Sequence, residues 1–301
     1  MTRRNFLGAA TESGLARPFK RSVAITIDDL NPETVPQKWR KQVDGELLGL
    51  LGRRGIRAAV FVVGKYTDEP GGMARVQRWG DAGHILGNHT YSHRALGIEV
   101  GAPDFERDIL RNELVLDRFS AFRRFFRFPM LKEGGTAAER DRVRAFLVSH
   151  GYRNGAVTID GSDWYYSSRL VDRLTADARF SVERYREPYI RHILGRAEYY
   201  DRISQAVLGR SVRHTLLIHY NLINFLFPEG LLDALEQQGW KFIDASEAFG
   251  DPVYERRPRI APAGESLLWA LAKASGRFEG ALRYPGEDGS YEKPILDQLG
   301  L

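Results

Sequence analysis

The chain has 301 residues, of which 28% are charged and 43% are hydrophobic, and its formal net charge at pH 7 is +5. This composition is that of an ordinary globular protein and excludes the disordered and fibrous classes. The 44 lysines and arginines are scattered through the sequence, so we expect no nucleic-acid-binding surface. No apolar stretch approaches the roughly 18 residues of a membrane-spanning helix. Because cysteine is absent, any metal site would have to use nitrogen and oxygen ligands.

The N-terminus resembles the start of a twin-arginine export signal. Two adjacent arginines precede the apolar run Phe6–Ala10, which ends at Thr11-Glu12. A working signal has an apolar region of about 7–15 residues, and this run is shorter. We therefore treat residues 1–20 as a segment with the features of a degenerate export signal. Two locations stay open, the periplasm or cell envelope if the segment works and the cytoplasm if it does not.

From residue 21 to residue 250, short β-branched or aromatic runs alternate with longer amphipathic stretches. The predicted strands are Val23–Ile27, Ala58–Val63, His84–Leu86, Phe125–Phe128, Ala156–Ile159, Thr215–His219 and Lys241–Ile243. The predicted helices between them include Trp39–Arg53, Gly72–Ala82, Phe105–Phe119, Ala137–Ser149 and Gly230–Gln238. Alternation with connections of this length predicts parallel βαβ units. About seven such units are typical of a barrel or of a doubly wound sheet.

Two regions lie outside this alternation. Residues 165–210 read as a long helical insertion, and residues 251–301 as a Pro/Gly-rich extension with one clear helix, Glu265–Ser275. We expect both to pack against the barrel formed by residues 21–250, because neither is large enough to be an independent domain.

The segment His89-Thr-Tyr-Ser-His93 places two histidines four residues apart. On a helix both imidazoles would lie on one face and could bind one ion. Alone, this motif is weak, and a pair of surface or capping histidines explains it better.

Two adjacent carboxylates, Asp28 and Asp29, follow the first predicted strand. Like charges so close repel each other, and a cation beside them removes that cost. Taken alone, an aspartate that caps the next helix is the simpler explanation. Together with the two histidines, however, one aspartate completes a site with open positions, which is typical of a hydrolytic metal centre. The other aspartate would lie where a base is needed, and His219, at the end of another predicted strand, is a candidate acid.

Further polar residues follow predicted strands, namely Arg127, Asp160 and Asp163. In a barrel of parallel strands, active-site residues gather at the C-terminal ends of the strands. This distribution favours the barrel over the doubly wound sheet.

These segments resemble, in order, the five motifs of the polysaccharide deacetylase family (NodB homology domain, carbohydrate esterase family 4). The matching segments are Thr26-Ile27-Asp28-Asp29, His89-Thr90-Tyr91-Ser92-His93, Arg127-Phe128-Pro129-Met130, Asp160-Gly161-Ser162-Asp163-Trp164 and Leu216-Leu217-Ile218-His219. Each motif is short, but five in order are a specific signal. The resemblance implies a NodB-like distorted (β/α) barrel of about seven parallel strands.

The resemblance also implies an activity, the hydrolytic removal of N-acetyl or O-acetyl groups from a carbohydrate. It implies one divalent metal ion, Zn²⁺ first with Co²⁺ or Ni²⁺ as alternatives, bound by Asp29, His89 and His93. Asp28 would then be the base and His219 the acid. Two other functions stay open: a metal-dependent amidase or esterase on a non-sugar acyl group, and a carbohydrate-binding protein that has lost turnover.

Two supporting roles follow from the same resemblance. Arg127 would orient Asp28, and an aspartate of the fourth motif would orient His219. Both Asp160 and Asp163 are candidates for that second role, and we choose Asp163.

The expected substrate contacts are Trp164, Met130 and Leu217. At two positions the sequence departs from the family pattern. Leu30 stands where the family usually has glycine, and we expect its side chain to add bulk near the groove. Met130 replaces the tyrosine of the third motif. We expect this replacement to affect which substrate is bound more than the chemistry of the reaction.

Overall fold

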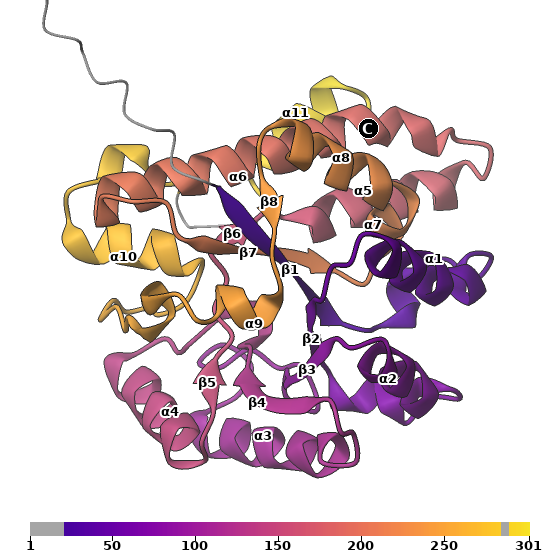
Figure 1. Ribbon diagram of the computed structural model, residues 1–301. Helices are drawn as coiled ribbons and strands as arrows, with labels where there is room; N and C mark the ends of the chain where they lie inside the picture. Colours follow the sequence, from indigo (N-terminus) through magenta and orange to yellow (C-terminus); the bar gives the residue numbers. More distant parts are fainter. Residues whose placement is uncertain (1–20, 284–288) are drawn as a thin grey trace, which may run out of the picture.

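The protein is described here by a computed structural model that covers residues 21–283 and 289–301. Its centre is a sheet of parallel strands in the order β5-β4-β3-β2-β1-β7-β6, with β8 paired to β1 (Figure 1). The strands are β1 Ser22–Asp29, β2 Ala59–Val62, β3 Ile85–Asn88, β4 Phe122–Phe126, β5 Arg153–Asn154, β6 Ile159–Asp160, β7 Arg213–His219 and β8 Lys241–Phe242. The sheet curls into a half-barrel, and it stays open in the described residues because β5 and β6 end this path. The predicted distorted barrel of about seven parallel strands is confirmed.

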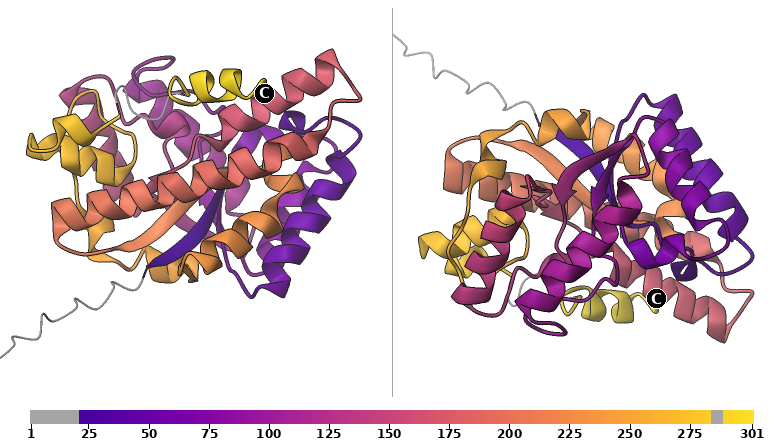
Figure 2. Two further views of the ribbon diagram at one scale, coloured as in Figure 1. Left: turned by 90° about the horizontal axis from the view of Figure 1, so that it is seen from above. Right: turned by 90° about the horizontal axis from the view of Figure 1, so that it is seen from below.

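The helices surround the sheet on its outer side (Figure 1). They are α1 Arg40–Arg53, α2 Gly72–Asp81, α3 Ala102–Leu116, α4 Ala137–Ser149, α5 Asp163–Ala176, α6 Arg186–Leu208, α7 Leu222–Leu226, α8 Pro228–Gln237, α9 Ala245–Ala248, α10 Leu267–Ser275 and α11 Glu292–Gln298. Figure 2 shows α6 as a long rod lying across the strands. None of the helices in the described ranges is long and apolar enough to cross a membrane.

The core follows from the composition of the central strands. The interior residues of β1 and all four residues of β2 are buried, because helices cover one face and the barrel interior fills the other. Such continuous apolar runs are the pattern of parallel strands that are covered on both faces.

Two predicted strands were misplaced. The predicted strand Phe125–Phe128 begins and ends too late, since β4 spans Phe122–Phe126. Residues 156–159 lie mostly in the connection between β5 and β6, and only Ile159 belongs to a strand. Gly155, directly after β5, lies against the ring of Phe61, where a side chain would overlap that ring. A run of β-forming residues does not reveal where the strand begins, because the packing that decides it comes from a distant strand.

The two additional regions have clear places in the fold. Residues 165–210 form most of α5 and α6, which connect β6 to its neighbour β7 and therefore act as the crossover of a βαβ unit. Residues 251–301 carry α10, which packs against α6. The proposed domain boundaries stay a prediction, and the export-signal prediction concerns residues 1–20, which lie outside the described ranges.

His84 generates a prediction about stability at acid pH. Its side chain is 3% exposed, and Nδ1 accepts a hydrogen bond from the backbone N–H of Ala58 at 3.0 Å. Burial, assisted by the nearby Arg57, lowers the pKa of His84 to about 4 from 6.5. As the pH falls below 6.5, His84 therefore takes up a proton in the unfolded chain but not in the folded chain. The free energy of unfolding decreases with falling pH over this range, down to about pH 4.

We expect the free energy of unfolding to fall by about 2–3 kcal/mol from this residue between pH 7 and pH 4.5. His84→Asn keeps an acceptor and cannot be protonated, so urea titrations should show a smaller loss in that variant. His150→Asn is the matched control. An unchanged pH dependence in His84→Asn would show that this imidazole does not govern acid stability.

Candidate active site

The C-terminal ends of the central strands meet at one mouth of the half-barrel. β1 and β7 pair in a register that sets Asp28 opposite His219, and β2 pairs with β3 so that Val62 lies opposite Asn88, next to His89. A cleft of about 470 Å³ opens there. Its lining residues are Asp28, Asp29, His89, His93, Met130, Leu131, Lys132, Asp160, Trp164, Leu217, His219 and Glu265. The structure therefore brings together most of the residues that the motifs selected.

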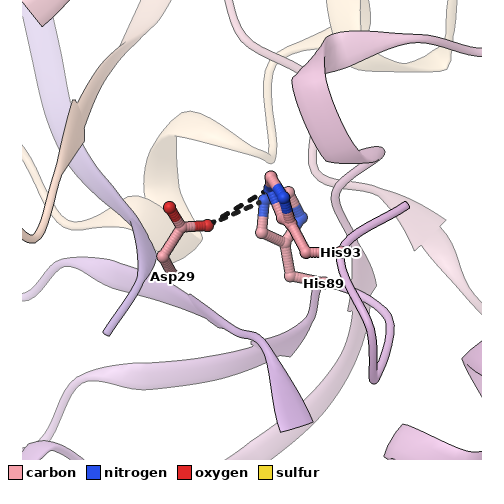
Figure 3. A group of neighbouring side chains, drawn as sticks. All are labelled: Asp29, His89 and His93. Carbon is pink, nitrogen blue, oxygen red and sulfur yellow. Dashed lines mark ion pairs between the residues drawn. The ribbon is translucent and has the colours of Figure 1, made fainter. Parts of the chain in front are cut away.

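Asp29, His89 and His93 converge on one point (Figure 3). Oδ1 of Asp29 lies 3.5 Å from Nε2 of His89 and 3.3 Å from Nε2 of His93. This oxygen is buried and has no hydrogen-bond partner. A buried carboxylate oxygen that faces two imidazole nitrogens is a donor set that fits a divalent cation.

The tautomer of His89 suits the same role. Its Nδ1 lies 2.7 Å from the carbonyl oxygen of Arg127, and because a carbonyl only accepts, Nδ1 carries the proton. Burial, together with the nearby His93, keeps the pKa of His89 well below its ordinary value. Its Nε2 lone pair is therefore available to a metal ion.

The histidine motif is not helical, so the prediction of a shared helix face was wrong. Thr90 and His93 both have left-handed backbone conformations, with φ values of 59° and 60°. The loop is held by side-chain acceptors: Oδ1 of Asn88 takes the N–H of Thr90 at 2.9 Å, and Oδ2 of Asp108 takes the N–H of Ser92 at 2.9 Å. A turn of the chain, rather than helical periodicity, brings the two rings together.

Asp28 forms a buried ion pair with Arg127. Nη1 of Arg127 lies 3.0 and 3.1 Å from the two carboxylate oxygens, and the side chains are only 3% and 1% exposed. Burial raises the pKa of Asp28 to about 6, against the opposing charge of Arg127. The pKa of Asp28 therefore lies close to neutral pH, which is what a general base working near neutral pH requires.

Arg127 is itself fixed from three sides. Its Nη2 donates to Oγ1 of Thr26 at 3.2 Å, and its Nε donates to the carbonyl oxygen of Gly155. The guanidinium lies over the ring of Phe61, 4.3 Å from the centroid. That ring fits only because Gly87 and Gly155 have no side chains to meet it. No motif in the sequence indicates this support of Arg127.

His219 is held by Asp163. Nδ1 of His219 lies 2.7 Å from Oδ1 of Asp163, whose side chain is fully buried. Oδ2 of the same carboxylate accepts from the backbone N–H of His219 at 2.8 Å, from Asn221 at 2.9 Å and from Asn224 at 2.5 Å. Burial opposes the charged imidazole, but the charge and hydrogen bond of Asp163 outweigh it and raise the pKa of His219 to about 10.

The choice between the two aspartates of the fourth motif can be made on this contact. Asp163 touches His219, whereas Asp160 lies in the cleft wall and accepts from the N–H of Ser162 at 3.1 Å. Asn224 is in turn held by the hydroxyl of Tyr189, which donates to its Oδ1. The crossover helix α6 therefore contributes to the support of His219.

The two departures from the family pattern have different outcomes. Leu30 takes a left-handed conformation, with φ 50°, and is 1% exposed. The expectation that it adds bulk near the groove was wrong, since the side chain packs into the core. Met130 also has a positive φ, 53°, but is 54% exposed and lines the cleft beside Trp164 and Leu217.

Lys132 and Glu265 also line the cleft, and neither was among the site residues predicted from the sequence. Lys132 follows the third motif by two residues, which was the available signal. Nothing in the sequence around Glu265 indicated that the C-terminal extension reaches the site.

The buried pair of Asp28 and Arg127 predicts that the stability losses of variants at these two positions do not add. In Arg127→Met the carboxylate keeps its burial and loses its cation, so we expect a loss of about 3–5 kcal/mol in stability at pH 8. Asp28→Asn combined with Arg127→Met removes both charges and should lose less than the two single variants added together. Denaturant titrations of the four proteins without metal would measure this coupling, and additive losses would contradict it.

Comparison with known proteins agrees with the geometry. A sequence model of the polysaccharide deacetylase family matches residues 16–155. A peptidoglycan-N-acetylglucosamine deacetylase of Bacillus cereus is 29% identical over 111 residues, which is 36% of this chain and 36% of that protein. The match thus spans little more than a third of that relative.

Two solved structures share the fold. The chitin deacetylase of Colletotrichum lindemuthianum aligns with a TM-score of 0.53 and 20% identity, covering 77% of this chain and 90% of that one. A CE4 family pseudoenzyme of Bacillus anthracis aligns with a TM-score of 0.53 and 16% identity, covering 77% and 66%. The match of residues 16–155 to the polysaccharide deacetylase family and the common fold agree with the resemblance of the five motifs.

Proposed function

We propose that this chain is a metal-dependent hydrolase that removes N-acetyl groups from a carbohydrate. The observation that carries the proposal is that one cleft holds three complementary parts. They are a candidate metal site at Asp29, a carboxylate base at Asp28 and an aspartate-held imidazole at His219. The peptidoglycan and chitin deacetylases named above support the substrate class.

The metal site would take one divalent ion through Asp29, His89 and His93, most suitably Zn²⁺, with Co²⁺ and Ni²⁺ as alternatives. Such an ion polarises a carbonyl group and lowers the pKa of water from 15.7 toward about 7.

Asp28 and His219 would divide the proton transfers between them. With its pKa at about 6, Asp28 is ionised at neutral pH and takes a proton from the attacking water. With its pKa at about 10, His219 is protonated, and because Nδ1 is occupied by Asp163, Nε2 donates to the leaving amine. Amide hydrolysis needs this proton, since an amine anion is a very poor leaving group. The backbone N–H of Met130 would assist the oxyanion.

The two other functions are less well supported. A protein that only binds sugar has no need of Asp28, Arg127 and His219, and here all three are present in contact with their partners. A non-sugar acyl substrate would not need an exposed aromatic ring in the cleft. Trp164 is 40% exposed there and offers a face on which a sugar ring can stack.

Acetate release is the direct test of the proposal. Metal-free protein supplied with Zn²⁺, Co²⁺ or Ni²⁺ should release acetate from acetylated chitooligosaccharides, peptidoglycan fragments or acetylxylan. Asp28→Asn has nearly the same shape and cannot accept the proton, so its rate should fall by about 10²–10⁴-fold. Near-normal turnover in this variant would show that Asp28 is structural, and no release from any substrate would contradict the proposed activity.

Metal content tests the site separately. We expect one divalent ion per wild-type chain and a sharp loss in His93→Ala, because two ligands hold an ion far less tightly than three. Elemental analysis after dialysis measures this, with His150→Ala as the control histidine outside the cleft. Equal metal content in wild type and His93→Ala would contradict the proposed metal site.

The role of His219 can be separated from that of the metal by the leaving group. In His219→Ala, hydrolysis of an amide should fall by about 10²–10⁴-fold, whereas an activated ester, whose nitrophenolate leaves unaided, should lose much less. The alkaline limb of the pH profile should also disappear for the remaining ester activity. Equal losses on both substrates would mean that His219 stabilises charge without donating the proton.

A further inference from the structure

The C-terminal extension forms part of the cleft wall. Residues 263–265 run alongside residues 131–134 and share three backbone hydrogen bonds with them, at N···O distances of 2.9, 2.9 and 3.0 Å. The next two residues continue to the other side of the mouth. There the N–H of Leu267 donates to the carbonyl oxygen of Val157 at 2.7 Å, and Ser266 donates to that of Thr158 at 3.0 Å. The segment is thus fastened to both flanks of the site.

Glu265 is held in an unfavourable backbone conformation within this segment. Its φ is 65°, in the left-handed region that side-chain-bearing residues avoid. The preceding residue, Gly264, leaves no room for a side chain because a Cβ would overlap the carbonyl of Leu131. Such strain persists only where surrounding contacts impose it, and it often accompanies a functional position.

This conformation brings the carboxylate of Glu265 to the ammonium group of Lys132. The two side chains form an ion pair and both line the cleft, with side-chain exposures of 13% and 31%. The two partners belong to different parts of the chain: Lys132 lies just after the third motif, and Glu265 lies in the C-terminal extension. The pair presents donors and acceptors side by side with little net charge.

We propose that Lys132 and Glu265 form a subsite that accepts an uncharged, hydroxyl-bearing sugar beside the acetylated one and disfavours an acidic sugar there. The inference rests on the proposed deacetylase function and names the substrate class more closely. A sugar hydroxyl can accept from the ammonium group and donate to the carboxylate at once. A sugar carboxylate that approaches Lys132 meets the charge of Glu265 as well, which offsets the attraction of the ammonium group.

The test compares two substrates in three proteins. The neutral substrate is a chitin tetrasaccharide, and the acidic one is a hyaluronan tetrasaccharide, in which N-acetylglucosamine alternates with glucuronic acid. In Glu265→Gln the cation is no longer balanced, so the ratio of kcat/KM for the acidic over the neutral substrate should rise by about three- to tenfold, mainly through KM. In Lys132→Met the neutral substrate should lose kcat/KM by a similar factor, and the acidic substrate should not gain.

Glu279→Gln is the matched control. It removes the acid of another lysine–glutamate pair of the extension, formed with Lys273 outside the cleft, and should leave the substrate ratio unchanged. A structural disturbance in Glu265→Gln would lower kcat/KM for both substrates. A change in the ratio of the two kcat/KM values therefore identifies an effect on the choice between an acidic and a neutral sugar. Equal changes on the two substrates would overturn the inference.

Calorimetric titration with the same two tetrasaccharides separates this inference from the proposed function. If wild type releases no acetate and Glu265→Gln still shifts the binding ratio toward the acidic tetrasaccharide, the deacetylase proposal fails and the subsite stands. If wild type releases acetate and neither the kinetic nor the binding ratio moves in Glu265→Gln, the subsite fails and the deacetylase proposal stands.

Discussion

The ion pair between Asp28 and Arg127 is the contact on which the rest of the site depends. A charged pair with side-chain exposures of 3% and 1% is costly to desolvate, and it persists only where further hydrogen bonds satisfy it. Those bonds come from Thr26 on β1 and from the backbone of Gly155 beyond β5. Arg127 thus ties the first strand of the sheet to its far end, across the interior of the half-barrel.

The two titrating groups of the cleft are separated by their surroundings. Asp28 and His219 lie on adjacent strands, opposite each other in register, yet their pKa values are moved to about 6 and about 10. In model peptides the pKa values of an aspartate and a histidine are about 3.9 and about 6.5, so both values are raised here and the gap between them is wider. Environments that separate two pKa values assign the roles of base and acid, and the assignment here depends on Arg127 for one group and on Asp163 for the other.

The sequence allowed the central features to be predicted because they are local. The apolar run of β1 leads directly into Asp28 and Asp29, and the other motif residues lie at or shortly after the ends of strands that alternate with helices along the chain. The fold class and the clustering of the motif residues followed from this. The export-signal prediction for residues 1–20 cannot be compared with the described structure.

What could not be predicted depends on contacts between distant segments. The loop with the left-handed residues Thr90 and His93 is held partly by Asp108 of α3, and a spacing of four residues resembles a helix whether or not one forms. Leu30 occupies a position that resembles a glycine site, but its burial is decided by the core around it. Glu265 reaches the cleft only because the extension pairs with residues 131–134, more than a hundred positions earlier.

The packing around Phe61 restricts how this site can evolve. Its ring fills the space that side chains at Gly87 and Gly155 would need, and it supports the guanidinium of Arg127 from below. A larger residue at either glycine could be accepted only after Phe61 had become smaller, and that first step would remove the surface on which Arg127 rests. The order of substitutions is therefore constrained, and variation among close descendants of this chain should concentrate in the cleft wall rather than beneath the base.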